Sequence, residues 1–402
     1  MGITEAKVRF DGESLAQAQA LIQELGLDGW LLYDFHGNNP IASGVLGLPG
    51  LTRRYFVLIP AQGRPVALTH RIEQQPWEGW IGETRRYLGW QSLQLELKRM
   101  LSGLGRVAME FSPSDAVPYL DRVPAGVLEM VQATGVSVVS SADLASALYS
   151  RWSEAGLASH LRAGEVLRET AFAAFDHVGD LLRSGRRVNE WQMREWVVDR
   201  LTSRGVSVGV DSIVAVDANA ANPHYAPGAD SHSEIRPGCV LLIDLWGKES
   251  DASVFADQTW MAYIGTSVPD RVQHLWTTIR DARDSAVEFI RSRHATGQAL
   301  AGFEVDDVCR GLIVDRGLGD FFLHRTGHSI DRELHGSGPN IDNLETRDTR
   351  LLIPGIGFSI EPGVYLESDT GLRTEIDVFM TPNGPEITTP EPQHDLYLVP
   401  VG

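Results

Sequence analysis

The chain has 402 residues, of which 43% are hydrophobic, and its 53 acidic and 35 basic side chains give a net charge of −18. This length favours a globular protein of two domains. The acidic excess argues against nucleic acid and membrane surfaces as partners, because both bind clusters of Lys and Arg.

The two cysteines and the apolar segments restrict the class of protein further. Cys239 and Cys309 lie far apart and outside any CxxC pattern, which argues against a disulfide framework and a thiolate metal site. The first ten residues, MGITEAKVRF, lack the basic and apolar regions of a secretory signal. Apolar runs such as VLLIDLW are too short to span a bilayer. We therefore expect a cytoplasmic protein with two packed free thiols.

The first 158 residues alternate between helical and extended patterns. Amphipathic spacing predicts helices at 16–27 and 141–152. Short apolar runs bounded by turn residues predict strands at 29–35, 54–60, 65–70 and 106–111. This alternation is typical of helices packed on a sheet, so we expect an α/β domain over residues 1–158.

The second domain, expected over residues 159–402, contains long helices and acidic strand pairs. Apolar positions on one face predict a helix at 161–182, and further helices are expected at 189–201, at 272–292 and from Val305. Asn189 is a candidate cap for the second of these. Strand pairs are expected at 239–247 with 254–265, and at 355–366 with 372–380. Two helical parts, each followed by an acidic hairpin, suggest a duplicated half-domain.

Each strand pair carries a carboxylate on both arms: Asp244 with Asp257, and Glu361 with Glu375. Strand interiors disfavour Asp, and four carboxylates in one core would repel each other. Divalent cations would neutralise such a set. The alternative is that these side chains lie at sheet edges or on solvent-facing surfaces.

A histidine cluster, FFLHRTGHSIDRELHG, contains His324, His328 and His335. A single histidine is more often structural than a ligand, but three within twelve residues favour a site. Four carboxylates and an imidazole suit Mn²⁺, Co²⁺ or Zn²⁺. Two such ions roughly 3.5–4 Å apart would activate a bridging hydroxide and polarise a scissile carbonyl.

These motifs resemble the pita-bread metallopeptidases, in particular the proline-specific branch that contains prolidase (Xaa-Pro dipeptidase) and aminopeptidase P. The resemblance covers residues 159–400 and rests mainly on IEPGVYL followed by GLRTEIDV. His335 seven residues after His328, His324 four residues before it, and His224 in ANPHYAPG also match. The amino-terminal LGLDGWLLYDF resembles the creatinase-type domain that precedes this catalytic core. The expected fold is therefore a creatinase-like α/β domain followed by a pita-bread catalytic domain.

The resemblance implies a set of five metal ligands for two ions, with Mn²⁺ favoured and Co²⁺ or Zn²⁺ as alternatives. Asp244 would bind one ion, Asp257 and Glu375 would bridge both, and His328 and Glu361 would bind the second. Glu361 would also accept the proton of the nucleophilic water.

The resemblance also implies residues that act beside the metal. His224 and His335 would hold the substrate carbonyl and stabilise the tetrahedral intermediate. His324 is expected among the catalytic residues, and Arg373 is expected to orient a ligand carboxylate. The implied partner is a small peptide with proline after the scissile bond, and the enzyme is expected to be a homodimer.

Three departures from the family pattern leave every expected ligand in place. Asp244 and Asp257 are thirteen residues apart, whereas the family usually spaces them eleven apart. The glycine-rich GHGxG becomes GHSID, which changes the loop near Ser329 and Asp331. Gly336 replaces the usual acidic residue after the substrate histidine.

Several functions remain open at this point. Creatinase lacks the ligand set, methionine aminopeptidase lacks this amino-terminal domain, and non-catalytic pita-bread modules that bind peptides have lost the ligands. Dipeptidase and aminopeptidase P are closer alternatives. A dipeptidase must bind the proline carboxylate, for which Arg347 and Arg350 are candidates, although both could equally belong to a solvated loop. The resemblance to dimeric prolidases leaves open that the amino-terminal domain of a second protomer supplies the positive group instead. The short chain and these arginines favour the dipeptidase.

Overall fold

The structure, a computed structural model, describes residues 9–401 and divides into two compact units, Met1–Ser150 and Arg151–Gly402. Each unit combines helices with β-sheet, which confirms the expected two-domain α/β fold. The segment in which the sequence predicts no secretory signal lies mostly outside the described residues. None of the helices in the described part of the chain has the length and apolar character that a bilayer span requires.

The amino-terminal unit contains a six-stranded sheet in the order β4-β3-β2-β1-β5-β6. β2 runs antiparallel to both neighbours and the other five strands are parallel to one another. The strands are β1 (Gly29–Asp34), β2 (Tyr55–Pro60), β3 (Val66–His70), β4 (Glu83–Tyr87), β5 (Arg106–Met109) and β6 (Ser137–Ser140). The helices are α1 (Gly12–Glu24), α2 (Pro40–Leu46), α3 (Trp90–Met100), α4 (Ala125–Gln132) and α5 (Ala142–Leu148).

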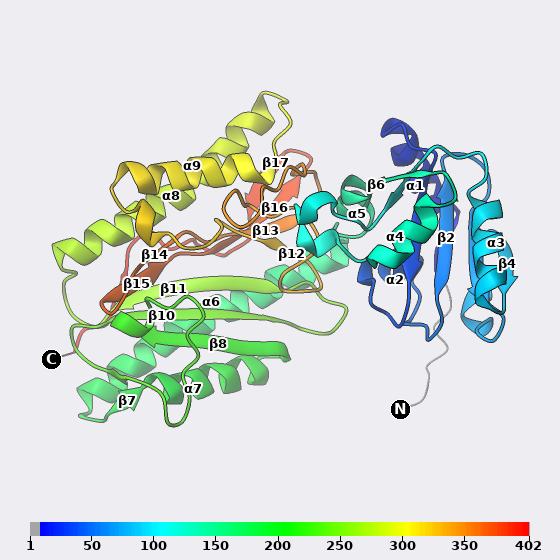
Figure 1. The fold of residues 1–402 in the computed structure, drawn as a ribbon. Helices are drawn as coiled ribbons and strands as arrows, with labels where there is room; N and C mark the ends of the chain where they lie inside the picture. Colours follow the sequence, from blue (N-terminus) through cyan, green and yellow to red (C-terminus); the bar gives the residue numbers. More distant parts are fainter. Residues whose placement is uncertain (1–8, 402) are drawn as a thin grey trace. The chain divides into compact units, whose positions relative to one another are not determined.

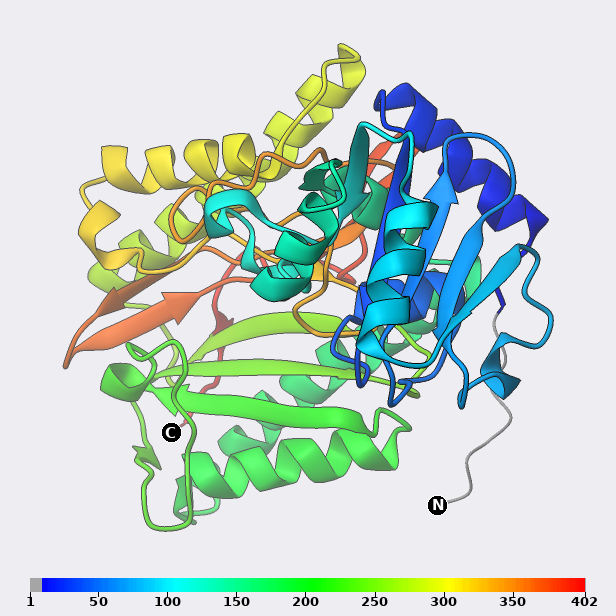
Figure 2. The ribbon, with the colours of Figure 1, turned by 45° about the vertical axis from the view of Figure 1, so that its right-hand side comes forward.

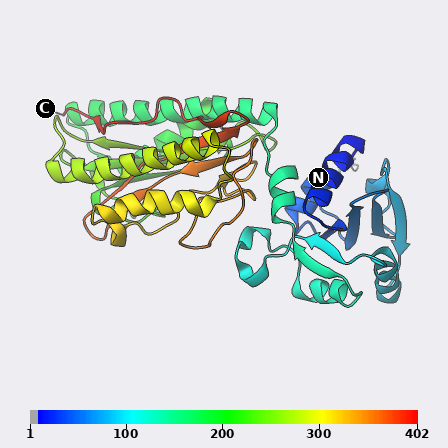
Figure 3. The same ribbon diagram turned by 90° about the horizontal axis from the view of Figure 1, so that it is seen from above.

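Helices cover both faces of this sheet, which explains the continuous apolar sequence of its central strand. On β1, Trp30 and Leu32 pack with α1, α2 and α5, whereas Leu31 and Tyr33 pack with α3 and α4 on the other face. Figure 3 shows α1, in dark blue, on one side of the sheet and α3 and α4 on the other. A strand that is buried on both faces lacks the polar alternation of a half-exposed strand.

The carboxy-terminal unit contains two four-stranded sheets, in the orders β18-β11-β10-β8 and β12-β13-β16-β17, and two two-stranded sheets, β14-β15 and β7-β9. Its longer strands are β8 (Val208–Val216), β10 (Val240–Lys248), β11 (Ala256–Tyr263), β13 (Gly357–Ile360), β14 (Gly363–Leu366), β15 (Thr370–Arg373), β16 (Ile376–Thr381) and β17 (Gly384–Ile387). Two-residue strands are β7 (Val188–Asn189), β9 (Glu234–Ile235), β12 (Ser329–Ile330) and β18 (Tyr397–Leu398).

Four helices of this unit form two pairs, one on each layer of strands. The first pair is α6 (Glu154–Arg183) with α7 (Glu190–Ser203), and the second is α8 (Asp270–Ala295) with α9 (Gly302–Asp315). Figures 1 and 2 show α6 and α7 on one side of the sheet that contains β8, β10 and β11, and α8 and α9 beyond the strands of the other. Asn189 caps α7 as expected, because its side chain accepts from the amide of Gln192 (2.8 Å).

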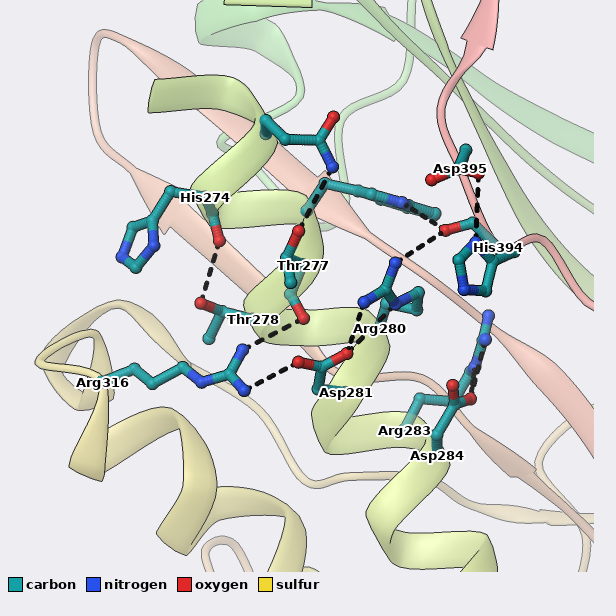
Figure 4. Close-up of polar contacts among 12 residues, drawn as sticks. His274, Thr277, Thr278, Arg280, Asp281, Arg283, Asp284, Arg316, His394 and Asp395 are labelled. Atoms are coloured by element: carbon teal, nitrogen blue, oxygen red, sulfur yellow. Dashed lines mark hydrogen bonds and ion pairs between the residues drawn. The ribbon is translucent and has the colours of Figure 1, made fainter. Parts of the chain in front are cut away.

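Polar contacts fix α8 between α9 and the end of the chain (Figure 4). Arg316, directly after α9, donates to a carboxylate oxygen of Asp281 (2.7 Å) and to the carbonyl of Thr277 (3.2 Å). The indole of Trp276 donates to the carbonyl of His394 (2.9 Å). These contacts connect α8 to α9 and to the carboxy-terminal segment.

Arg283 extends these contacts towards the strands that carry the expected ligands. It is only 3% exposed, and its Nη1 donates to the hydroxyl of Thr374 (2.8 Å) and to the carbonyl of Gln393 (2.9 Å). Thr374 directly precedes Glu375, so α8 supports the backbone that presents this glutamate.

Candidate metal centre

Asp244 and Asp257 project from neighbouring strands onto one face of their sheet. In the antiparallel ladder of β10 and β11, Asp244 lies opposite Thr259, and Trp246 lies opposite Asp257. Residues that face each other, and residues two apart on one strand, share a face of the sheet. Both aspartates therefore lie on the face that packs towards the second sheet, as Leu242 does. The ladder is continuous from Val240 to Gly247, so the longer turn leaves the pairing intact, as expected.

Glu361 and Glu375 face each other where two ladders meet. Ile360 pairs with Ile376 at the end of one ladder, and Gly363 pairs with Arg373 at the start of the next, in the same register. Pro362 lies in the gap and has no amide hydrogen to donate, which explains the interruption. The two glutamates are therefore presented at a break in the pairing. The hydroxyl of Thr259 donates to Glu375 Oε2 (2.8 Å), which ties this break to β11.

His328 reaches the carboxylates from a loop that lies directly against β13. Its amide donates to the hydroxyl of Ser359 (3.0 Å), and its carbonyl accepts from the amide of Ser359 (2.9 Å). The approach requires glycine at the preceding position, because a Cβ on Gly327 would lie 1.9 Å from the carbonyl oxygen of Ser359. His328 Nε2 then lies 3.4 Å from Asp257 Oδ2 and 3.5 Å from Glu361 Oε1.

The structure brings the five expected ligands into one buried cluster. One potential ligand atom from each of Asp257, His328 and Glu375 lies within 4.8 Å of the others, and all three side chains are buried. Glu361 lies next to this group because its Oε1 is 3.5 Å from His328 Nε2. Asp244 is close enough for the charges of Asp257 and Glu361 to raise its pKa. The sequence alternative, in which these carboxylates lie at exposed edges, does not describe this arrangement.

Burial and mutual repulsion raise the pKa values of three of the carboxylates. Desolvation raises the pKa of Asp244 to about 7, with Asp257 and Glu361 adding to the effect and Arg373 opposing it. Desolvation followed by the charges of Asp257 and Glu361 raises the pKa of Glu375 well above its usual range. The pKa of Asp257 is also raised by desolvation, while His328 lowers it. The protein alone thus does not fully compensate the negative charge here.

These observations fit a centre for divalent cations. Carboxylate oxygens and an imidazole are hard donors of the kind that Mn²⁺, Co²⁺ and Zn²⁺ accept. Asp244 Oδ1 is buried and has no hydrogen-bond partner among the described residues, so its desolvation is uncompensated by the protein. A cation at this position would satisfy that oxygen and lower the repulsion among the four carboxylates.

Arg373 and two aromatic side chains form a polar chain behind Asp244. The guanidinium of Arg373 pairs with Asp244 and is 4% exposed. Its Nη1 also donates to the hydroxyl of Tyr365 (3.4 Å), which lies 2.7 Å from His324 Nε2. His324 Nδ1 contacts the carbonyl of Arg325 (2.7 Å), so both nitrogens of His324 are engaged. His324 therefore reaches the ligands through Tyr365 and Arg373.

His335 and His224 lie on the open side of the cluster. The ring of His335 is 4.4 Å from that of His328, centroid to centroid, and the side chain is exposed. Desolvation, followed by the charges of His328 and Arg325, lowers the pKa of His335 to about 4. His224 is exposed and close enough to contribute to this electrostatic shift. Both histidines can therefore meet a ligand that enters from solvent.

Ser329 and Asp331, which stand in place of family glycines, shape the loop that carries His335. Asp331 accepts from the amides of Glu333 (2.7 Å) and Ser337 (3.1 Å), and Ser329 Oγ accepts from the amide of Gly338 (3.0 Å). A Cβ at Gly336 would lie 2.7 Å from a carboxylate oxygen of Asp331. The unusual GHSID sequence and the glycine at 336 thus belong to the same local packing.

The two arginines proposed to bind a substrate carboxylate lie in different environments. Arg350 is 3% exposed and donates twice to the buried Asp348 (2.9 and 2.6 Å) and once to the carbonyl of Ser337 (2.7 Å). Arg347 is exposed, with its guanidinium carbon 4.4 Å from the ring centroid of Phe303. In this structure Arg350 is engaged by an internal ion pair, whereas Arg347 faces solvent.

Two residues at the centre were missed by the sequence reasoning. Arg325 is 8% exposed and its charge acts on His328, His335 and Glu361. Its position inside the histidine cluster, directly after His324, was the available signal. Tyr365 lies within the motif IEPGVYL, but nothing local indicates that its hydroxyl joins His324 to Arg373.

Comparison with known proteins gives consistent matches along the chain. The model of metallopeptidase family M24 matches residues 161–382. The probable dipeptidase PepE of Mycobacterium tuberculosis is 25% identical over 410 residues, which cover 98% of this chain and 99% of the relative. The Xaa-Pro dipeptidase of Lactobacillus delbrueckii subsp. lactis is 32% identical over 174 residues, or 43% of each chain. The crystal structure of dipeptidase PepE from Mycobacterium ulcerans superposes with a TM-score of 0.73 at 24% identity, covering 97% of this chain and 98% of that one.

Proposed function

The chain belongs to metallopeptidase family M24, and from that premise we propose that it is a two-metal Xaa-Pro dipeptidase. The observation that carries the proposal is the mutual approach of Asp257, His328 and Glu375 in a buried site. The similarity to a probable dipeptidase over nearly the whole chain and to an Xaa-Pro dipeptidase over part of it supports the choice of substrate. In this proposal residues 159–402 form the catalytic domain.

The proposed ligands hold two divalent cations, with Mn²⁺ favoured and Co²⁺ or Zn²⁺ as alternatives. The five ligands are Asp244, Asp257, His328, Glu361 and Glu375. When bound, the cations supply Lewis acidity, which lowers the pKa of water and polarises a carbonyl group. The buried and partly uncompensated carboxylates support this assignment.

The chain's own residues then carry the proton and hold the substrate. Glu361 accepts the proton of the attacking water, because it lies at the ladder break beside His328. His335 and His224 donate to the developing oxyanion from the open side. Arg373 holds Asp244 in place, and the chain of Tyr365 and His324 fixes that guanidinium in turn.

A dipeptidase also needs a cation for the proline carboxylate. Arg347 is exposed, while Arg350 would have to leave its ion pair with Asp348 to bind this carboxylate. Arg325 is a third candidate, since its charge already acts on His335 and Glu361. The second function to consider is aminopeptidase P, which hydrolyses longer Xaa-Pro peptides and needs no such cation at the second residue.

The remaining parts of the proposal concern the assembly and its location. We propose a cytoplasmic homodimer that acts on small peptides and binds neither nucleic acid nor membrane. Both cysteines are free and buried, which is compatible with a reducing compartment. Light scattering of the purified protein would test the dimer, and a monomeric mass would contradict it.

A matched assay tests the proposed substrate. Hydrolysis of Xaa-Pro dipeptides is compared with that of Xaa-Pro-Yaa tripeptides after reconstitution with Mn²⁺, Co²⁺ or Zn²⁺. The proposal expects faster turnover of dipeptides and its loss on exhaustive chelation. Equal or faster turnover of tripeptides would select aminopeptidase P. Full turnover in protein shown by elemental analysis to be metal-free would reject the two-metal mechanism, and a metal-loaded protein without peptidase activity would favour a binding module.

A further inference from the structure

A cavity of about 600 Å³ opens in the amino-terminal unit at the carboxyl edge of its sheet. The ends of β1, β3 and β4 supply Tyr33, His70 and Tyr87 to its wall, and the segment before β2 supplies Arg53 and Arg54. In open α/β sheets this edge is where ligands commonly bind. The volume is within the range of small-molecule sites, which is roughly 300–1,000 Å³.

The described residues that line this cavity include two arginines and two histidines but neither Asp nor Glu. Among the described residues, the guanidinium groups of Arg53 and Arg54 form no ion pair; that of Arg53 donates only to Thr52, and that of Arg54 lies beside the hydroxyl of Tyr87. The nearby Glu73 is occupied by the amides of Thr52 and Arg53 (2.9 Å each). The cavity therefore has a positive wall.

Tyr33 supplies a polar group that the protein itself leaves without a partner. Its side chain is 4% exposed, and its hydroxyl forms no hydrogen bond with any described residue. The other carboxylate close to it, that of Asp34, accepts from the amides of Gly37 (3.0 Å) and Asn39 (2.9 Å). Burial raises the pKa of Tyr33 to about 12, so the hydroxyl remains a donor at neutral pH. A hydroxyl without a protein partner that lines a cavity is well suited to donate to an acceptor atom of a ligand.

Two helices also begin at this cavity without a side-chain cap. The N-cap of α3 is Gly89 and that of α4 is Pro124, and both residues line the cavity. The hydroxyl of Ser92 accepts from the amides of Leu88 and Gly89 (3.1 Å each), which precede the helix, and the N-cap Gly89 has no side chain to accept from the first-turn amides of α3. Uncapped amides and the helix dipole favour an anion at such a position.

Aromatic side chains give the cavity an apolar rim. Phe35 is 40% exposed and Trp90 is 62% exposed, values unusual for side chains of this size. His36 adopts φ 60° and packs edge-on against Phe35 with a centroid distance of 4.3 Å. A flat apolar group could be covered by these rings while its charged end meets Arg54 and Tyr33.

We propose that this cavity is a second ligand site, for a small organic anion in which a planar ring carries a carboxylate or a phosphate group. The charged group binds Arg53, Arg54 and the hydroxyl of Tyr33, and the ring lies against Phe35 and Trp90. All residues of this site belong to the amino-terminal unit, and the proposal does not depend on the proposed peptidase mechanism.

Calorimetric titration of the full-length protein tests the proposal with four probes: phenyl phosphate, phenylacetate, inorganic phosphate and the neutral 2-phenylethanol. At least one aryl anion is expected to bind about tenfold more tightly than both inorganic phosphate and 2-phenylethanol, because only it uses both parts of the cavity. A preference between the two aryl anions identifies phosphate or carboxylate as the charged group. Equal binding of 2-phenylethanol, or no binding of either aryl anion, would overturn the proposal.

Variants then locate the bound probe. Arg54→Gln and Tyr33→Phe are each expected to lower the affinity for the aryl anion. The arginine substitution should lower it by roughly tenfold or more. Arg64→Gln is the matched control, since Arg64 is exposed in the turn between β2 and β3 at the opposite edge of the sheet. Tyr33→Phe keeps the aromatic packing, so its fold is tested by thermal unfolding alongside. Wild-type affinity in both cavity variants would place the probe elsewhere and overturn the assignment.

Discussion

Glu110 is a buried carboxylate in the amino-terminal unit whose protonation should control the stability of that unit. It is fully buried and accepts hydrogen bonds from Trp30 Nε1 (2.6 Å), Ser141 Oγ (3.0 Å) and Asn39 Nδ2 (2.8 Å). Desolvation raises its pKa from 4.5 to about 7, against the effect of these three donors. The folded protein therefore binds a proton at Glu110 over a pH range in which the unfolded chain has released it.

The difference in pKa fixes the sign and size of the effect. A carboxyl group with a raised pKa in the folded state contributes stability below pH 4.5, and this contribution is lost as the pH rises through 7. Each pKa unit corresponds to about 1.4 kcal/mol, so a shift of this size corresponds to about 3 kcal/mol. The free energy of unfolding should thus fall by roughly that amount between pH 4 and pH 8 because of this one group.

Urea unfolding of the full-length protein from pH 4 to pH 8, followed by tryptophan fluorescence, measures the effect. The side chain of the Glu110→Gln variant cannot ionise, so this variant lacks the loss of stability that Glu110 causes in the wild type. The free energy of unfolding of the variant minus that of the wild type should therefore rise by about 3 kcal/mol from pH 4 to pH 8. Glu129→Gln is the control, because Glu129 is exposed in the same unit and should leave the pH profile parallel to that of wild type. A parallel profile for Glu110→Gln as well would refute the reasoning.

Four further variants test the carboxy-terminal unit. Glu361→Gln should abolish nearly all turnover, whereas His335→Ala should lower turnover and keep the metal content measured by elemental analysis; loss of metal in the histidine variant would show that His335 is itself a ligand. Asp348→Asn leaves the buried guanidinium of Arg350 without its counter-charge and should lower the free energy of unfolding by about 3–5 kcal/mol in urea denaturation. Asn189→Ala removes the cap of α7 and should cost about 1 kcal/mol, and an unchanged urea midpoint would show that the cap contributes nothing.

The sequence predicted those features that depend on local pattern. One carboxylate on each arm of two strand pairs predicted that these side chains would meet in one place, and the structure brings Asp257 and Glu375 together with His328. Their role as metal ligands was implied by the family resemblance and stays a prediction. The cap of α7 was predictable because Asn189 and the amide it binds are three residues apart. By contrast, β4 was not predicted, because its sequence, ETRRY, is charged and lacks the apolar pattern of a buried strand. The structure places this strand at the edge of the sheet.

Pairings between distant side chains were beyond the reach of the sequence. Arg347 and Arg350 looked alike as two arginines of one polar loop, yet one is exposed and the other is buried against Asp348. The difference depends on how the loop folds over Ser337, thirteen residues before Arg350. The link from His324 through Tyr365 to Arg373 likewise exists only once separate strands have packed together.

The contacts that join the two acidic hairpins also determine when the centre can form during synthesis of the chain. The amide of Asp257 donates to Asp377 Oδ2 (3.0 Å), and Thr259 donates to Glu375, across separations of 120 and 116 residues. Loops of this length close late, because their entropy cost must be met before the contacts stabilise the chain. Pulse-labelled hydrogen exchange should therefore find the Asp257 amide among the last to be protected. A nascent chain that has not yet released Glu375 from the ribosome would lack one of the four carboxylates, so the complete set could bind cations only after nearly the whole enzyme has been made.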